Sequence, residues 1–174
     1  MGHLNVEIKA HCDNQEKIRD ILKEKRADFK GIDHQVDTYF NVRSGRLKLR
    51  EGNIENSLIF YDREEKKGPK ESKVILLSHD PKTNLKEILV CSLGVVVEVD
   101  KQRAIYFLDN VKFHIDKVKG LGNFIEIEAI DKNGTIGTER LHEQCRQYLN
   151  LFNVAEKDLI SSSYSDLLLK KSKT

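Results

Sequence analysis

The segment from Phe124 to Ala129 reads FIEIEA and places glutamate at every second position. In a β-strand, successive side chains point to opposite faces, so Glu126 and Glu128 would share one face while Ile125 and Ile127 share the other. Two neighbouring carboxylates on one face can supply oxygen ligands to a hard divalent cation such as Mg²⁺. The segment therefore predicts a strand whose polar face is able to bind a metal ion.

Long charged side chains recur on one face of other predicted strands. Asn5, Glu7 and Lys9 alternate near the N-terminus, and His114 and Asp116 alternate in a later segment. Bases that recur in the same manner are Arg46, Lys48, Arg50, Arg63, Lys101 and Arg103. For any single strand, a sheet with one solvated face is the simpler explanation. Across the strands, however, carboxylates and bases together fit a metal–polyphosphate complex, because Lys and Arg donate hydrogen bonds to phosphate oxygens.

The hydrophobic and turn signals predict a mostly β chain. The expected strands are residues 4–11, 34–42, 46–51, 57–63, 72–78, 95–107, 111–118 and 123–131, with a turn at Gly31 after the first helix. The expected helices are residues 13–27 with Asp13 as N-cap, a short helix between Pro81 and Gly94, and residues 138–152 and 157–170. About eight antiparallel strands can close into a barrel, and charges pointing inside then need a partner or a ligand.

The composition limits the function. A chain of 174 residues is the size of one ordinary domain. The net charge of +2 argues against a surface for nucleic acid. No apolar run approaches the roughly 20 residues that span a bilayer, and the start lacks the apolar core of a signal peptide, so we expect a cytoplasmic protein without a membrane part. Cys12, Cys91 and Cys145 are odd in number and widely spaced, which predicts plain thiols.

Seven segments carry a resemblance to a known family. They are VEIKA, QVDTYFNV, LKLREG, LIFYDR, GPKES, DKQRAIYF and HIDKVKGLGNFIEIE, in this order. Together they resemble the CYTH family of triphosphate tunnel metalloenzymes, most of all its class IV adenylyl cyclase branch, from about Asn5 to the C-terminal SYSDLL. The resemblance implies an α+β fold in which an eight-stranded antiparallel closed β-barrel, the triphosphate tunnel, carries flanking helices. Residues 1–174 are then expected to form a single CYTH-like domain.

The resemblance also implies roles for individual residues. Glu7, Glu126 and Glu128 match the metal-binding glutamates of the family, with Asp116 beside them as a ligand or as a group that supports one. The residues that match its phosphate-binding bases are Lys9, Lys48, Arg50, Arg63, Lys70, Lys101 and Arg103. Of these, Lys70 is expected in or beside a loop. Glu7, Lys9, Glu126 and Arg63 are expected to act in catalysis, and the implied cofactor is Mg²⁺ or Mn²⁺.

One position departs from the family pattern. The family opens on Glu-x-Glu-x-Lys, but Asn5 stands at the place of the first glutamate. Asparagine still offers a carbonyl oxygen, yet it lacks the charge, so we expect weaker metal binding or a different metal occupancy, and the number of metal ions stays open.

The expected function is that of a metal-dependent enzyme on a small-molecule triphosphate. The leading reaction is that of a class IV adenylyl cyclase, which converts ATP into cyclic AMP and pyrophosphate. A triphosphatase that hydrolyses thiamine triphosphate or inorganic tripolyphosphate is the alternative, and a non-catalytic module that binds triphosphate or polyphosphate is a second one. No nucleic acid or membrane partner is expected, and a homodimer through an outer sheet face stays open.

Overall fold

The computed structural model describes residues 2–63 and 67–173, and of Arg63 it describes the backbone alone. The long strands are β1 (His3–His11), β2 (Asp28–Phe40), β3 (Arg46–Gly52), β4 (Ser57–Arg63), β5 (Lys70–Ser78), β6 (Val95–Leu108), β7 (Val111–Val118) and β8 (Gly122–Asp131). The helices are α1 (Gln15–Glu24), α2 (Leu85–Leu93), α3 (Thr138–Leu151) and α4 (Tyr164–Ser172). A short 3₁₀ turn, η1 (Glu156–Asp158), leads into the two-residue strand β9 (Leu159–Ile160).

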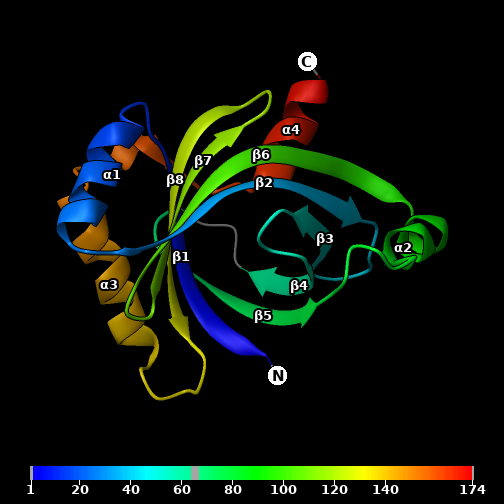
Figure 1. The fold of residues 1–174 in the computed structure, drawn as a ribbon, viewed down its shortest axis with the longest axis horizontal. Helices are drawn as coiled ribbons and strands as arrows, with labels where there is room; N and C mark the ends of the chain where they lie inside the picture. The colour runs from blue at the N-terminus through cyan, green and yellow to red at the C-terminus, as the bar shows by residue number, and fades with distance from the viewer. Residues whose placement is uncertain (1, 64–66, 174) are drawn as a thin grey trace.

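The long strands of the described residues form a closed antiparallel barrel (Figure 1). Their order is β5-β4-β3-β2-β6-β7-β8-β1, and β1 pairs back onto β5 to close the sheet. β5 takes the first half of the free edge of β1, from His3 to Glu7, and β9 continues along that edge at Lys9 and Ala10. The predicted eight-stranded closed barrel with flanking helices is confirmed.

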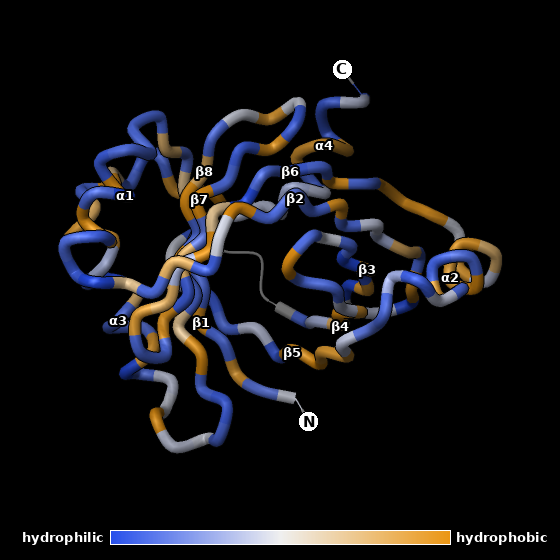
Figure 2. The backbone as a smooth tube through the Cα atoms, in the orientation of Figure 1, coloured by the Kyte–Doolittle hydropathy of each residue, from blue (hydrophilic) through white to orange (hydrophobic). Residues whose placement is uncertain are grey.

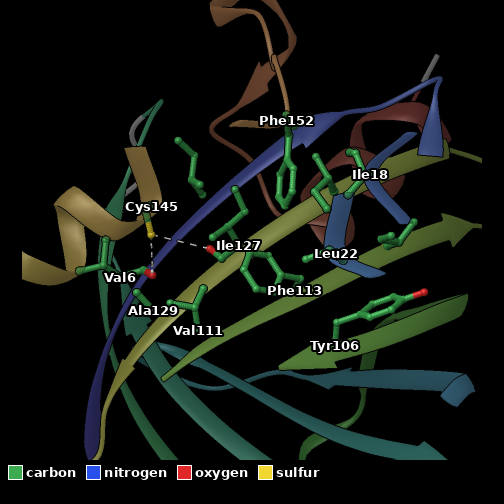
Figure 3. Packing of buried hydrophobic residues seen from close by; sticks show 14 of the residues in the cluster. Val6, Ile18, Leu22, Tyr106, Val111, Phe113, Ile127, Ala129, Cys145 and Phe152 are labelled. Atoms are coloured by element: carbon green, nitrogen blue, oxygen red, sulfur yellow. Dashed lines mark hydrogen bonds between the residues drawn. The ribbon is translucent and has the colours of Figure 1, made fainter. Parts of the chain in front are cut away.

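The larger hydrophobic core lies outside the barrel, between its wall and helices α1 and α3 (Figure 3). The strand residues of this core are Val6, Ile8, Ala10, Ala104, Tyr106, Val111, Phe113, Ile115, Ile125, Ile127 and Ala129. Ile18 and Leu22 pack against them from α1, and Leu141 and Cys145 pack from α3. Because apolar residues at alternate strand positions face outward, the charged residues between them face the lumen.

Helix α2 lies apart from this core. None of its residues is buried, although the segment LKEILVCSL is mostly apolar. Figure 2 shows this apolar helix, with the apolar start of β6 beside it, at the end of the molecule away from α1 and α3. Among the described residues, no helix combines the length and the apolar character that a membrane crossing requires. The cysteines are free thiols, as predicted, and Cys145 Sγ donates to Val6 O at 3.3 Å.

Two predictions near the first helix were wrong. Gly31 is not a turn but lies inside β2, with φ of 124°, where the pairing with β6 shifts between Phe29 and Gly31. Such a bulge needs the conformational freedom of glycine. The helix is capped by Asn14 rather than Asp13, because the Asn14 side chain accepts a hydrogen bond from Lys17 N.

The last helix begins at Tyr164 and not near residue 157 as predicted. Residues 156–160 form the 3₁₀ turn and β9 instead. The helix start is defined by a capping box, in which Ser163 Oγ accepts from Asp166 N and Asp166 Oδ2 accepts from Ser163 N. These reciprocal bonds satisfy two backbone donors that helix geometry leaves open.

Replacing Phe113 with Ala is expected to lower the free energy of unfolding by about 3–5 kcal/mol, because the ring is fully buried and packs on the rings of Tyr148 and Phe152. Ile88→Ala serves as the control, since this side chain on α2 is 59% exposed and should change stability by less than about 0.5 kcal/mol. Urea unfolding measures both. Equal losses for the two variants would contradict the placement of the core.

Candidate functional site

The lumen of the barrel contains a cavity of about 570 Å³, and each of the eight long strands contributes side chains to its lining. The predicted site residues on this lining are Glu7, Lys9, Lys48, Arg50, Arg103, Glu126 and Glu128. Asp116, Lys70 and Lys101 are buried behind it, each at most 1% exposed. Alternation along the strands explains the grouping, since these residues occupy the inward positions of β1, β3, β6 and β8.

Strand pairing arranges acids and bases in rows across the lumen. Lys9 on β1 is the direct partner of Glu126 on β8, and its Nζ lies 3.6 Å from Glu126 Oε2. In the neighbouring row, Glu7 on β1 is paired with Glu128, which is paired in turn with Lys112 on β7. Carboxylates and cations from three strands therefore meet on one side of the lumen.

Asp37 on β2 gathers three of the predicted phosphate-binding cations. Its carboxylate accepts from Arg50 Nε and Nη2 at 2.8 and 2.9 Å, from Lys101 Nζ at 2.8 Å and from Lys48 Nζ at 3.0 Å. Burial by itself would raise the pKa of Asp37, but the charges of Arg50, Lys101 and Lys48 outweigh burial and hold that pKa well below its usual range. Arg50 also donates to Glu55 Oε2 at 3.1 Å, and burial holds the pKa of Lys101 well below its usual range. Three basic side chains thus share Asp37, an arrangement that suits an anionic ligand.

Arg103 on β6 is held by Asp116 on β7. Its Nε and Nη2 donate to the two oxygens of Asp116 at 2.7 and 2.6 Å, and Nη2 also donates to Glu126 Oε2 at 3.3 Å. Asp116 Oδ2 accepts a further hydrogen bond from Tyr164 OH at 2.7 Å. Both carboxylate oxygens of Asp116 are thereby engaged, so a ligand role would require Arg103 or Tyr164 to release it. The geometry favours the other predicted role, that of a supporting group.

Glu128 and Asn5 form an oxygen-rich part of the lining. Asn5 Nδ2 donates a short hydrogen bond to Glu128 Oε1, whereas Asn5 Oδ1 is buried without a hydrogen-bond partner among the described residues. Burial raises the pKa of Glu128 to about 7, and the carboxylates of Glu126 and Glu7 add to the rise against the opposing charge of Lys112. A bound cation would favour the ionised form of Glu128 by supplying the missing positive charge.

The oxygen atoms of Glu128, Glu7 and Asn5 suit a divalent ion that takes its other ligands from a bound phosphate. The part of the chain that the structure describes holds no group of three or more His, Cys, Asp or Glu side chains close enough to bind a metal. Mg²⁺ beside phosphates is usually held by one or two carboxylates, phosphate oxygens and water. Glu128, its partner Glu7 and the open amide oxygen of Asn5 are donors of this kind.

His114 is a neutral group in this charged lining. It is 2% exposed, neither ring nitrogen has a hydrogen-bond partner among the described residues, and Nδ1 lies 3.9 Å from Glu126 Oε2. Burial, followed by the charge of Arg103, lowers the pKa of His114 to about 3. Glu126, in contrast, is held in its charged form. Lys9 and Arg103 keep its pKa well below its usual range, although burial alone would raise that pKa.

Lys70 and Arg63 are predicted cations at strand ends. Lys70 is the first residue of β5, directly beside the bend at residues 67–69 as expected, and it lies opposite Glu7, with its Nζ donating to Ser161 O at 2.7 Å. Arg63 is the last residue of β4, and its side chain lies outside the described part of the chain. The predicted phosphate-binding role of Arg63 therefore stays a prediction.

Lys112 and Glu55 are two charged lining residues that are absent from the predicted site. Lys112 faces Glu128 across the β7–β8 pair and makes a short ion pair with Glu55. The alternation that indicates His114 and Asp116 includes Lys112, so the signal was available in the sequence. Glu55 lies between β3 and β4, where no strand period predicts the direction of a side chain.

Replacing Asp37 with Asn is expected to lower the free energy of unfolding by about 3–5 kcal/mol at neutral pH, because three cations lose their shared counter-ion. Since the folded-state pKa of Asp37 is depressed, its contribution is present above the unfolded pKa of about 3.9 and is lost as the pH falls through the folded value. Urea unfolding from pH 7 down to pH 3 measures this. The gap between the wild type and the variant should shrink on acidification.

Asp62→Asn is the matched control, since this aspartate on β4 is exposed and should change stability by less than about 0.5 kcal/mol. An Asp37→Asn variant as stable as the wild type at pH 7 would contradict the proposed charge balance.

Comparisons with known proteins agree on a family. The family model described as the CYTH domain matches residues 3–164. A Methanocaldococcus jannaschii protein named "Putative adenylate cyclase" is 27% identical over an alignment 181 residues long, and this alignment covers 94% of this chain and 98% of that protein. The structure of the PH1012 protein from Pyrococcus horikoshii OT3 matches with a TM-score of 0.78 at 25% identity, covering 94% of this chain and 98% of the other.

A Hippeastrum protein shares the fold at greater distance. Its structure, described as a "putative adenylyl cyclase" with a dominant triphosphatase activity, matches with a TM-score of 0.64 at 14% identity, covering 99% of this chain and 96% of the other. The closed barrel agrees with the matches to these two solved structures. The chain belongs to the CYTH domain family.

Proposed function

We propose that this protein is a metal-dependent enzyme that acts on an organic triphosphate in the barrel lumen, with ATP conversion into cyclic AMP and pyrophosphate as its reaction. One observation carries the proposal: carboxylates from β1 and β8 and cations from β1, β3 and β6 line a single cavity. The name of the Methanocaldococcus jannaschii relative, which aligns over nearly its whole length, supports the cyclase reaction.

The phosphate chain would be held by the cations of the lumen. Lys9, Lys48, Arg50 and Arg103 reach the cavity, and Asp37 or Asp116 already orients three of them. Groups that are oriented before the ligand arrives stabilise developing charge with little reorganisation, which is the main source of catalysis in phosphoryl transfer. We also assign a phosphate-binding role to Lys101, which donates to Asp37 as Lys48 and Arg50 do, and to Lys70 and Arg63.

The acidic residues would hold the metal. Glu7, Glu126 and Glu128, with the amide oxygen of Asn5, would bind Mg²⁺ or Mn²⁺ together with phosphate oxygens. When bound, the ion supplies positive charge that stabilises the phosphate oxygens as a P–O bond breaks. Glu126 also orients Arg103 and Lys9, so its carboxylate connects the acidic and basic parts of the lining.

A triphosphatase is the second candidate. In a cyclase the ribose 3′-hydroxyl attacks the α-phosphorus, whereas in a triphosphatase water attacks the γ-phosphorus, and the same cations could serve both reactions. The dominant triphosphatase activity of the Hippeastrum protein, which has the same fold, makes hydrolysis the natural alternative. The position of the phosphates along the lumen decides between the two.

The described cavity-lining residues of β4 and β5 are neutral, and this neutral patch favours an organic triphosphate over inorganic tripolyphosphate. The cavity-lining residues of β4 and β5 are Ser57, Ile59, Tyr61, Ser72, Val74, Leu76 and Ser78. These hydroxyl and apolar groups suit the base and sugar of a nucleotide, or another organic group, better than they suit phosphate oxygens.

The proposal is tested by incubating the purified protein with ATP, thiamine triphosphate or tripolyphosphate plus Mg²⁺ or Mn²⁺ and identifying the products. Cyclic AMP with pyrophosphate supports the cyclase, and inorganic phosphate supports the triphosphatase. Binding without any product would leave the non-catalytic module, an outcome that the missing charge at Asn5 makes worth testing. Chelation of the metal by EDTA is expected to abolish turnover.

Glu126→Gln is expected to lower kcat by about 100-fold or more, because the change removes a metal-binding charge and the partner of Lys9 and Arg103. Initial rates with the preferred triphosphate and saturating metal measure the effect. Glu143→Gln on α3 is the control, since Glu143 is exposed and pairs with Arg140 away from the lumen. Similar rates for the wild type and Glu126→Gln would rule out this site.

Leu76→Lys is expected to strengthen tripolyphosphate binding by about fivefold, because it places a cation on the neutral patch at a position already 45% exposed. Leu77→Lys is the matched control, since the next side chain along β5 points outward and is 61% exposed. Calorimetric titration of each variant with tripolyphosphate and with ATP decides the matter. Wild-type protein that already prefers tripolyphosphate to ATP would contradict the role given to this patch.

A further inference from the structure

Tyr164 brings the C-terminal helix into the lumen. It is the first residue of α4, only 5% exposed, and it lines the same cavity as the phosphate-binding cations. Its hydroxyl donates to Asp116 Oδ2 at 2.7 Å. No motif in the sequence indicates this contact, because 48 residues separate the two side chains.

The bond from Tyr164 continues into the basic part of the site. The same oxygen of Asp116 accepts from Arg103 Nη2 at 2.6 Å, and Arg103 reaches Glu126 at 3.3 Å. A hydrogen bond to a buried carboxylate stabilises the charge on it and restricts its rotamer. Tyr164 therefore acts on the direction in which Arg103 presents its remaining donors to the cavity.

The ring of Tyr164 contacts a second cation. Lys9 Nζ lies 3.9 Å from the ring centroid, and the Phe124 ring packs at a centroid distance of 4.9 Å on the same residue. An aromatic face attracts an ammonium group at this distance and also limits its motion. One side chain thus touches Lys9 directly and Arg103 through Asp116.

Helix α4 is fixed in place beside the barrel. Arg46 on β3 donates to both oxygens of Asp166 at 2.8 and 3.1 Å, and Asp166 completes the capping box at the helix start. Leu167 and Leu168 pack against the apolar residues at this end of the barrel. The placement of the Tyr164 hydroxyl therefore depends on the docking of the whole helix.

We propose that Tyr164 is a positioning residue for the triphosphate site, which acts by aligning Arg103 through Asp116 and by holding Lys9 under its ring. The inference rests on the proposed function, because it assigns Tyr164 a role in the binding of the same ligand. It makes the C-terminal helix a component of the site and not only a cover of the barrel.

Tyr164→Phe removes the hydroxyl and keeps the ring over Lys9, so it isolates the path through Asp116. We expect tripolyphosphate affinity, measured by calorimetric titration in the presence of Mg²⁺, to fall about fivefold, the effect of one lost hydrogen bond of about 1 kcal/mol. Tyr148→Phe on α3 removes a phenolic hydroxyl outside the lumen and should leave the affinity unchanged. Thermal unfolding of each variant checks that the fold is retained.

A double variant separates positioning from general stability. If Tyr164 acts through Arg103, then Tyr164→Phe added to Arg103→Lys should cost little beyond the loss from Arg103→Lys alone, since the two residues share one interaction. Arg46→Gln, which loosens α4 without touching the lumen, should weaken binding in the same direction. Unchanged affinity in Tyr164→Phe, or full additivity in the double variant, would overturn the inference.

Triphosphate binding by the wild type distinguishes a failure of the proposed function from a failure of the positioning role of Tyr164. Wild-type protein that binds neither tripolyphosphate nor ATP would overturn the proposed function together with this inference. Wild-type binding of normal strength, with Tyr164→Phe indistinguishable from it, would overturn the positioning role alone.

Discussion

The pairing of buried charges is the constraint on which the rest of this structure depends. A closed lumen shields ionised groups from water, so every one of them needs a partner nearby. Asp37 and Asp116 meet this need on the basic side. Each is 2% exposed or less, and Asp37 is bonded to Lys48, Arg50 and Lys101, whereas Asp116 is bonded to Arg103. Because the cations are held by these two carboxylates, they point into the cavity before any ligand arrives.

Two faces of one sheet divide the work of folding and of binding. The outward residues of β1, β6, β7 and β8 pack with α1 and α3 into the larger apolar core. The lumen, in contrast, keeps a cavity of about 570 Å³, although the interior of an eight-stranded barrel can be filled by side chains. Since hydrophobic burial takes place outside, the inward positions are available for ionised groups whose burial does not favour folding.

Segments that are distant in the chain complete the lumen. Tyr164 on the last helix donates a hydrogen bond to Asp116, the partner of Arg103. In the loop before this helix, Ser161 O accepts a hydrogen bond from Lys70. The described cavity-lining side chains of β4 and β5 are neutral, so the charges among the described lining residues are unevenly distributed. This asymmetry suits a ligand with one anionic part and one neutral part, as in a nucleoside triphosphate.

The strand period alone determined which residues would face the lumen. Glu7, Lys9, Glu126 and Glu128 alternate with apolar residues, and side chains two positions apart share a face in any strand. The same alternation, read on all strands together, was compatible with a barrel that has charges inside, and the resemblance to the CYTH family implied that the sheet closes. Local signals were less reliable at the ends of elements. Gly31, predicted as a turn, lies in a β-bulge, and the capping box at Ser163 sets the start of α4 against the apolar pattern before it.

Only the tertiary structure decided which charges pair. Strand register and side-chain length decide these pairs. They bring Lys48, Arg50 and Lys101 to Asp37, and they bring Arg103 and Tyr164 to Asp116. The direction of Glu55, in a turn, and the arrival of Tyr164 from the C-terminal helix carry no periodic signal. Periodicity specifies the face of a residue, whereas its partner on that face follows from the three-dimensional closure of the sheet.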